Sequence, residues 1–151
     1  MRRLNNKGIS PVIATVILVA VAIAIAIAVA FWMTGIIGLF TRFEKLEITY
    51  VYATKAADGS YWTITLKVKN TGTADATIDN IFINGRPATA WTGFSSISPT
   101  AVTSGYSLSA GSEVTITITL SSGNEFVSGQ SIEVKVHTAS GQEYPKLVNL
   151  P

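Results

Sequence analysis

The side chains that most often carry enzyme chemistry are few in this sequence and are widely spread. His137 is the only histidine, there is no cysteine, and Asp75 and Asp79 stand in a predicted turn and a predicted strand. A zinc site or a Ser-His-Asp triad needs several such groups together, and a calcium loop needs regularly spaced oxygen ligands. No glycine-rich phosphate loop follows a strand. We therefore expect no enzyme activity, no metal and no cofactor, and we interpret His137 as an ordinary residue of a sheet.

The peptide bond between Gly8 and Ile9 is a better candidate for chemistry, as a bond that a protease cuts. Gly8 has no Cβ, so its backbone readily adopts the extended conformation that a protease can grip. Pro11 disfavours helix at Ser10 and readily begins a helix itself, which places the bond just outside the helix. Lys7, Gly8 and Ile9 therefore form the predicted processing site, and Ser10 and Pro11 the predicted helix start. The alternative is an uncleaved signal anchor in which Pro11 only marks where the helix starts.

The element that must position this bond is a long apolar run, which we assign to residues 9–43. No charged residue occurs between Lys7 and Arg42. About 30 helical residues at about 1.5 Å each give about 45–50 Å, which exceeds the roughly 30 Å of a bilayer's hydrocarbon core. The run is longer than the apolar part of a secretory signal and has no polar boundary at its end. We expect this segment to stay on the protein and to be able to span a membrane.

Between Val19 and Ala30, β-branched residues alternate with alanine. Such alternation usually indicates a strand, but an open strand in lipid would leave its backbone groups without hydrogen-bond partners, so we expect a helix. On a helix these alanines form two rows on nearly opposite sides, and rows of small residues let helices approach closely. The rows are Ala20, Ala24 and Ala28, and Ala22, Ala26 and Ala30. The alternative is that alanine is simply common in membrane helices.

Aromatic residues and glycines mark the far end of the run. Phe31 and Trp32 are of the kind that gathers at membrane–water boundaries, which predicts the outer interface here. Gly35 and Gly38 weaken a helix and form a predicted hinge before the following domain. Their alternative role is close packing.

The positive charge of the chain is concentrated at its start. The chain has 11 Lys and Arg against 9 Asp and Glu, and Arg2, Arg3 and Lys7 account for the whole excess. The rest of the chain is therefore close to neutral and has no nucleic-acid footprint. A short basic head before an apolar run predicts that residues 1–8 face the cytoplasm and that the domain lies outside.

The segment that joins this head to the apolar run resembles the N-terminus of archaeal type IV pilins. The matching residues are Lys7-Gly8-Ile9-Ser10-Pro11-Val12-Ile13-Ala14. The resemblance implies that residues 1–8 are a class III leader peptide, removed by a prepilin peptidase between Gly8 and Ile9. It further implies that the helix forms the core of a homopolymeric extracellular filament, assembled with a secretion ATPase and a membrane platform protein.

One residue departs from the better-known bacterial pattern. Bacterial type IV pilins are known for a Glu at the fifth mature position, where this chain would have Ile13. Archaellins and surface-anchored binding proteins resemble this N-terminus as well. The expected function is thus a pilus subunit that serves adhesion, and the alternatives are an archaellin-type motility subunit or an uncleaved, membrane-anchored binding module.

Residues 44–151 show the alternation of strands separated by turn signals. Asp58-Gly59 and Ser140-Gly141 are predicted turns, and residues 88–112 are predicted to be a long loop with short strand pieces. Leu46, Ile48, Tyr50 and Tyr52 are predicted to share one face of a first strand. The residues predicted to face inward on later strands are Trp62, Ile64, Leu66 and Val68, then Val114, Ile116, Ile118 and Leu120, and finally Ile132, Val134 and Val136.

Six or seven short strands at this spacing predict an immunoglobulin-like β-sandwich, so the fold class is α+β, with a long apolar N-terminal helix before an all-β domain. The phrase Val68-Lys69-Asn70-Thr71-Gly72 loosely resembles sandwich domains of archaeal surface filaments. The many outward Ser and Thr residues fit either O-linked sugars or plain polar strand positions, and we prefer the second interpretation.

Overall fold

The computed structural model describes residues 11–123 and 125–151. Lys7, Gly8 and Ile9 of the predicted processing site, and Ser10 of the predicted helix start, lie outside these residues. The chain divides into two units, with the division between Thr41 and Arg42.

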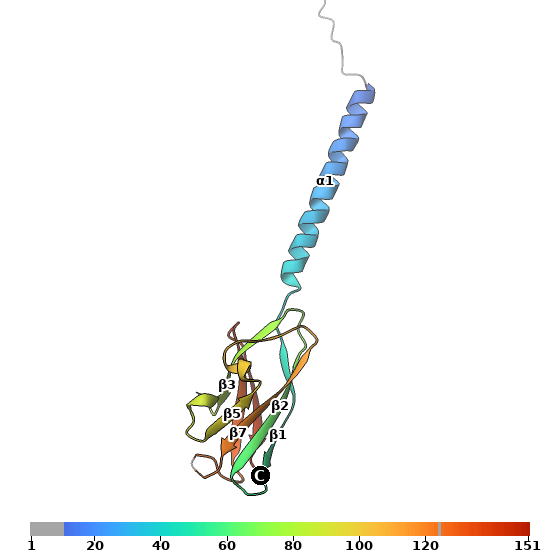
Figure 1. Ribbon diagram of the computed structural model, residues 1–151. Coiled ribbons are helices and arrows are strands. Elements are labelled where there is room, and N and C mark those ends of the chain that lie inside the picture. Colours follow the sequence, from blue (N-terminus) through green and yellow to red (C-terminus); the bar gives the residue numbers. More distant parts are fainter. Residues whose placement is uncertain (1–10, 124) are drawn as a thin grey trace, which may run out of the picture. The chain divides into compact units, whose positions relative to one another are not determined.

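The first unit is one helix, α1 (Pro11–Phe40), drawn as a single coil in Figure 1. Its sequence after Pro11 contains no further proline and no charge, so nothing in it removes a backbone donor or requires water. The helix continues through Gly35 and Gly38. By length and composition, residues Pro11–Gly38 are apolar enough to cross a membrane.

The second unit is a β-sandwich of two antiparallel sheets, which confirms the predicted fold class. The first sheet has the strand order β1-β2-β7-β5, and three of these strands, β1, β2 and β7, lie side by side in Figure 1. The second sheet has the order β4-β3-β8-β9, with β6 paired to β3. The bounds are β1 Leu46–Lys55, β2 Tyr61–Asn70, β3 Ala76–Ile83, β4 Arg86–Pro87, β5 Phe94–Ser98, β6 Tyr106–Leu108, β7 Glu113–Ser121, β8 Ser131–Thr138 and β9 Glu143–Asn149.

The core lies between the sheets and consists of the alternating apolar residues of the central strands. The predicted inward residues of β2, β7 and β8 are all buried. Between them on each strand, threonines and charged residues face solvent, which is the pattern of a sheet with one buried face. The prediction for these three strands is confirmed.

The prediction that Leu46, Ile48, Tyr50 and Tyr52 share one face of β1 is wrong, because a β-bulge interrupts the strand between Ile48 and Tyr50. Leu46 and Ile48 are buried, whereas Tyr50 and Tyr52 are exposed. A bulge adds one residue to one strand and so moves every later side chain to the opposite face. After the bulge, Val51 packs against the core instead.

A tight turn joins β3 to β4, and a long connection joins β4 to β7. Asn84 and Gly85 both have positive φ, 47° and 79°, which is the conformation of a tight type I′ hairpin turn between β3 and β4. The predicted long loop with short strand pieces contains the short strands β5 and β6, as expected, and also two 3₁₀ helices, Ala88–Ala90 and Thr100–Thr103. It crosses from one sheet to the other, since β5 pairs with β7 and β6 pairs with β3.

Candidate functional site

The candidate site is the surface of α1, because no side chain of this helix between Pro11 and Gly38 is buried within the chain. From Pro11 to Gly38 every residue is exposed except Ile36, which is half-buried. Burying a Val, Ile or Leu side chain is worth about 1.5–3 kcal/mol, so a helix of this composition in water would carry a penalty of tens of kcal/mol. The helix therefore requires an apolar environment from lipid or from other protein chains.

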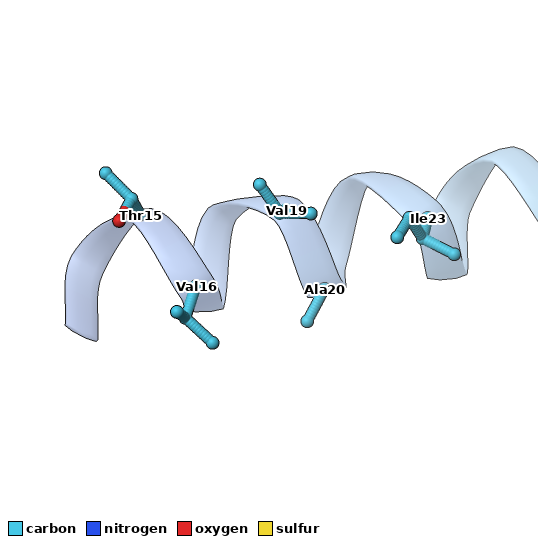
Figure 2. A pocket seen from close by; sticks show the side chains of 5 residues that line it. All are labelled: Thr15, Val16, Val19, Ala20 and Ile23. Carbon is cyan, nitrogen blue, oxygen red and sulfur yellow. The ribbon is translucent and has the colours of Figure 1, made fainter. Parts of the chain in front are cut away.

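The N-terminal half of α1 carries an open groove of about 380 Å³. Thr15, Val16, Val19, Ala20 and Ile23 line it, and Figure 2 shows these side chains along successive turns. Ala20 has the smallest side chain of the five, so it leaves space in the groove, and the larger side chains around it border that space. A side chain of another helix fits such a space by ridge-into-groove packing.

A second groove of about 380 Å³ lies farther along the same helix, lined by Ile27, Ala30, Phe31 and Thr34. At about 100° per residue, the lining residues of both grooves fall within one arc of about 160° around the axis. The two grooves therefore form one stripe, which we call the groove stripe. Ala20 and Ala30, one from each predicted alanine row, lie on it.

The two threonines of the groove stripe are already satisfied within the helix. The Thr15 hydroxyl donates to the carbonyl oxygen of Val12 at 2.8 Å, and the Thr34 hydroxyl to that of Ala30 at 3.0 Å. A polar group in an apolar environment is costly only when it lacks a hydrogen bond. Neither threonine thus opposes burial of the stripe.

The remaining predicted helix residues have no contact that would assign them a role. Ala22, Ala24, Ala26 and Ala28 are exposed on α1. A Cβ built on Gly35 or on Gly38 meets nothing within 4 Å, so neither glycine is required by packing inside this chain. Their predicted roles, as packing rows and as a hinge, stay predictions.

The residues that follow the helix are fixed to the β-sandwich by a feature that the sequence did not reveal, which we call the loop clamp. Residues 71–74 hold residues 43–45 through backbone hydrogen bonds: Thr71 N–H donates to the Lys45 carbonyl at 2.8 Å, and Thr73 N–H to the Phe43 carbonyl at 2.9 Å. The Phe43 N–H in turn donates to the Thr73 hydroxyl at 3.1 Å. These bonds tie the segment before β1 to the loop between β2 and β3.

Gly72 is at this position because the two segments approach too closely for a side chain. A Cβ on Gly72 would lie 2.5 Å from the Phe43 carbonyl oxygen and 2.6 Å from the Lys45 nitrogen, both of which are backbone atoms. Glycine is the residue that permits such an approach. The Asn-Thr-Gly phrase noted in the sequence is thus part of the attachment.

Asn70 supports the loop clamp from inside the domain. Its side chain is fully buried and makes three hydrogen bonds: its amide donates to the carbonyls of Ala74 at 2.8 Å and Leu108 at 2.9 Å, and its oxygen accepts from Gly72 N–H at 2.9 Å. A buried amide is stabilising only when it is satisfied in this way. Asn70 therefore holds the loop 71–74 against β6, the strand that ends at Leu108.

His137 lies on β8 as predicted, and it has a partner that the sequence did not indicate. Its Nδ1 contacts the Oδ1 of Asp79 on β3 at 2.5 Å, and its ring meets Phe82 edge-on with centroids 5.8 Å apart. Asp79 reaches it because β3 bulges between Ile78 and Asn80. Among residues 11–123 and 125–151, no group of three or more His, Cys, Asp and Glu side chains is placed to hold a metal ion.

Comparison with solved structures finds a similar fold in an archaeal flagellum. The archaeal flagellum of Methanospirillum hungatei strain JF1 is 21% identical, with a TM-score of 0.52 over 92% of this chain and 88% of that chain. The archaellum periplasmic stator protein FlaG from Sulfolobus acidocaldarius is 22% identical, with a TM-score of 0.47 over 70% of this chain and 99% of that chain.

The Iho670 flagellar-like filament is 14% identical, with a TM-score of 0.43 over 93% of this chain and 98% of that chain. The scores of the stator protein and of the Iho670 filament are below 0.5. No protein-family model matches the chain, and neither does any curated protein. The chain shares its fold, a helix followed by a β-sandwich, with the Methanospirillum flagellum.

Proposed function

We propose that this chain is the structural subunit of an extracellular filament of the type IV pilus class, which polymerises through α1 and serves adhesion. The observation that carries the proposal is the exposure of the apolar helix from Pro11 to Gly38, in a chain whose β-sandwich buries its own core. The helix needs apolar surroundings, whereas the β-sandwich needs none. A filament whose core is made of helices and whose surface is made of β-domains meets both requirements.

The energetics favour transfer of α1 from membrane to filament. Lipid tails and packed helices are similarly apolar, so exchanging one for the other carries no large solvation penalty. The groove stripe offers two grooves that can accept side chains of neighbouring helices. Its threonines already make hydrogen bonds within α1 and need none from a neighbour. Lipid-embedded subunits would then be a reservoir for assembly.

Assembly into an open polymer also needs two different surfaces on each subunit. Contacts between unlike surfaces that do not close into a ring generate a helical filament. In this proposal the groove stripe receives a neighbouring helix on one side of α1. Another neighbour packs on the far side of α1, where Ala28 lies.

Processing at Gly8-Ile9 is part of the same proposal. The basic residues Arg2, Arg3 and Lys7 would keep the N-terminus in the cytoplasm until a prepilin peptidase removes residues 1–8. A secretion ATPase and a membrane platform protein would then drive extraction. The resemblance of residues 7–14 to archaeal type IV pilins supports these partners.

The test is electron microscopy of the cell surface together with N-terminal sequencing of the sheared material. Filaments whose subunit begins at Ile9 are the expected result. A monomer in the membrane fraction that begins at Met1 would support the uncleaved, membrane-anchored binding module and would overturn the proposal. Gly8→Trp is the matched variant, and it should leave an uncut precursor in the membrane.

The second candidate function is an archaellum subunit, and the similarity to the Methanospirillum flagellum favours it. Both candidates are filaments with a helical core, so microscopy does not separate them. Deletion of the chain's gene does: loss of surface attachment supports the pilus, and loss of swimming supports the archaellum.

A further inference from the structure

The solvent side of the β1-β2-β7-β5 sheet carries two rows of hydroxyl groups, and we call this surface the hydroxyl face. Strand pairing aligns one row across all four strands, and the next row lies beside it. The first row is Thr54, Thr63, Thr119 and Ser96, and the second is Tyr52, Thr65, Thr117 and Ser98. At about 4.8 Å between strands, each row is about 15 Å long. All of these residues are exposed or half-buried.

The hydroxyl groups of these rows are almost entirely unused by the described part of the chain. Thr54 donates to the carbonyl of Thr63 at the long distance of 3.5 Å, and the other hydroxyls of the two rows make no hydrogen bond there. Each hydroxyl can donate one hydrogen bond and accept others. The hydroxyl face is thus an ordered set of free donors and acceptors.

Three tyrosines lie on the same face, and two of them are there because of the β1 bulge. Without the extra residue, Tyr50 and Tyr52 would point into the core, but in the structure they are 42% and 49% exposed, with ring centroids 5.9 Å apart. Tyr61, 43% exposed, begins β2 and pairs with Ser121 beyond the first row. Bulges often serve to re-aim side chains. Here the result is a group of exposed rings beside the hydroxyl rows.

The charges at the border of the hydroxyl face cancel. Lys67 forms an ion pair with Glu113 at 2.6 Å, and a hydrogen bond from Lys67 to this carboxylate raises the pKa of the lysine above its usual value. Strand pairing places Lys69 between Glu47 and Glu113. The border therefore has two positive and two negative groups, and the two rows have none. Such a surface has no attraction for a polyanion or an anionic membrane.

From these observations we infer that the hydroxyl face binds the surface of an uncharged, insoluble polysaccharide. Rows of hydroxyls exchange hydrogen bonds with the hydroxyls of sugars, and tyrosine rings offer an apolar face together with a polar tip. An open sheet face suits the side of a polymer better than a single sugar, which binds in a pocket. The inference rests on the proposed adhesion function and names the chemistry of the surface to which the filament adheres.

The test is cosedimentation of the full-length, unpolymerised protein in mild detergent with microcrystalline cellulose and with chitin. Carboxymethyl cellulose beads are the charged counterpart. We expect the wild-type protein to sediment with at least one uncharged polymer and not with the charged beads. Absence of binding to both cellulose and chitin, or equal binding to the charged beads, would overturn the inference.

Two sets of variants test the rings and the hydroxyls separately. Tyr50→Ala combined with Tyr52→Ala should weaken binding about tenfold, which corresponds to about 1.4 kcal/mol, because the variant loses two rings and their hydroxyl groups from the hydroxyl face. Thr65→Val combined with Thr117→Val keeps the β-branched shape while removing two hydroxyls, and should also weaken binding. Thr77→Val on the other sheet is the matched control and should bind as the wild type does. Unchanged binding by both double variants overturns the inference.

Filament assembly by the same variants separates this inference from the proposed function. Normal filaments with weakened polysaccharide binding support both. Folded variants that no longer assemble would show that the hydroxyl face is a contact between copies of the chain, which overturns the inference. A wild-type protein that binds cellulose or chitin but never polymerises would overturn the proposed function and leave the inference standing.

Discussion

The two units of this chain use the same residue types with opposite results. Ile23 on α1 is 55% exposed, whereas Ile118 on β7 is fully buried between the sheets. The β-sandwich meets its apolar demand within its own sequence, because alternation places one face of each strand inside. The helix is apolar all round, so its demand must be met by other molecules. One unit is thus complete after folding, and the other only after insertion or assembly.

The largest effect should come from filling the groove stripe. We expect Ala20→Phe to abolish polymerisation, because overpacking costs about 1–3 kcal/mol at each contact and the contact recurs at every subunit of the filament. Phe is apolar, so insertion of the helix in the membrane should persist. Electron microscopy measures filaments, and membrane fractionation measures insertion.

Leu18→Phe is the control for Ala20→Phe, since it exchanges two large apolar residues on the side of α1 away from the groove stripe. Filaments should form with this variant. Normal filaments from Ala20→Phe would show that the groove stripe receives no neighbour.

Truncation of an isoleucine should distinguish the two units directly. Ile118→Ala should lower the free energy of unfolding of the β-sandwich by about 2–5 kcal/mol, because it leaves a cavity in a packed core. Ile23→Ala should leave that free energy unchanged in detergent. Denaturant titration followed by tryptophan fluorescence measures both. Equal destabilisation by the two changes would contradict the independence of the units.

Addition of a methyl group to a glycine should have opposite signs in the two units. Gly72→Ala should destabilise the β-sandwich by about 1–3 kcal/mol, because the new Cβ collides with backbone in the loop clamp. Gly35→Ala meets nothing within 4 Å and should stabilise α1 by about 1 kcal/mol. Thermal unfolding measures the first variant and helicity by circular dichroism the second. A filament defect in the otherwise well-folded Gly35→Ala variant would support the predicted hinge.

The smallest effect should be a loss of stability at high pH, confined to the β-sandwich. A hydrogen bond to Glu143 raises the pKa of Lys135 above its usual 10.5, so the contribution of this pair is complete below pH 10.5 and is lost as the pH rises through the folded-state pKa. Glu143→Gln should reduce this loss when melting temperatures are compared between pH 9 and pH 12. The helix has no titratable residue between Lys7 and Arg42 and should not respond.

The sequence predicted regular elements well where local chemistry alone decides the structure. The charge-free run and the strict alternation in β2, β7 and β8 leave one stable arrangement each. The failure at Tyr50 and Tyr52 has a clear cause: β1 also alternates in the other register, through Val51 and Ala53, and only pairing with β2 selects the bulge. A pattern that fits two registers does not show where one changes to the other.

The attachment of residues 43–45 to the β-sandwich could not be predicted from the sequence, because the partner residues 71–74 are distant along the chain. Asn70 has the sequence context of a turn residue, yet its side chain is buried and its amide donates a hydrogen bond to the carbonyl oxygen of Leu108. Asp79 and His137 likewise meet across 58 positions of sequence. For α1, in contrast, the composition predicted an exposed apolar surface, but the groove stripe depends on side-chain shape.

The loop clamp also decides how the β-sandwich bears tension. β1 is an edge strand that starts at Leu46, so a pull transmitted along the chain would unzip it from β2 one rung at a time. The pull first reaches residues 43–45, whose hydrogen bonds to residues 71–74 must break before the pairing of β1 with β2 is loaded. A pull on α1 therefore loads the loop clamp before it loads the first strand of the β-sandwich.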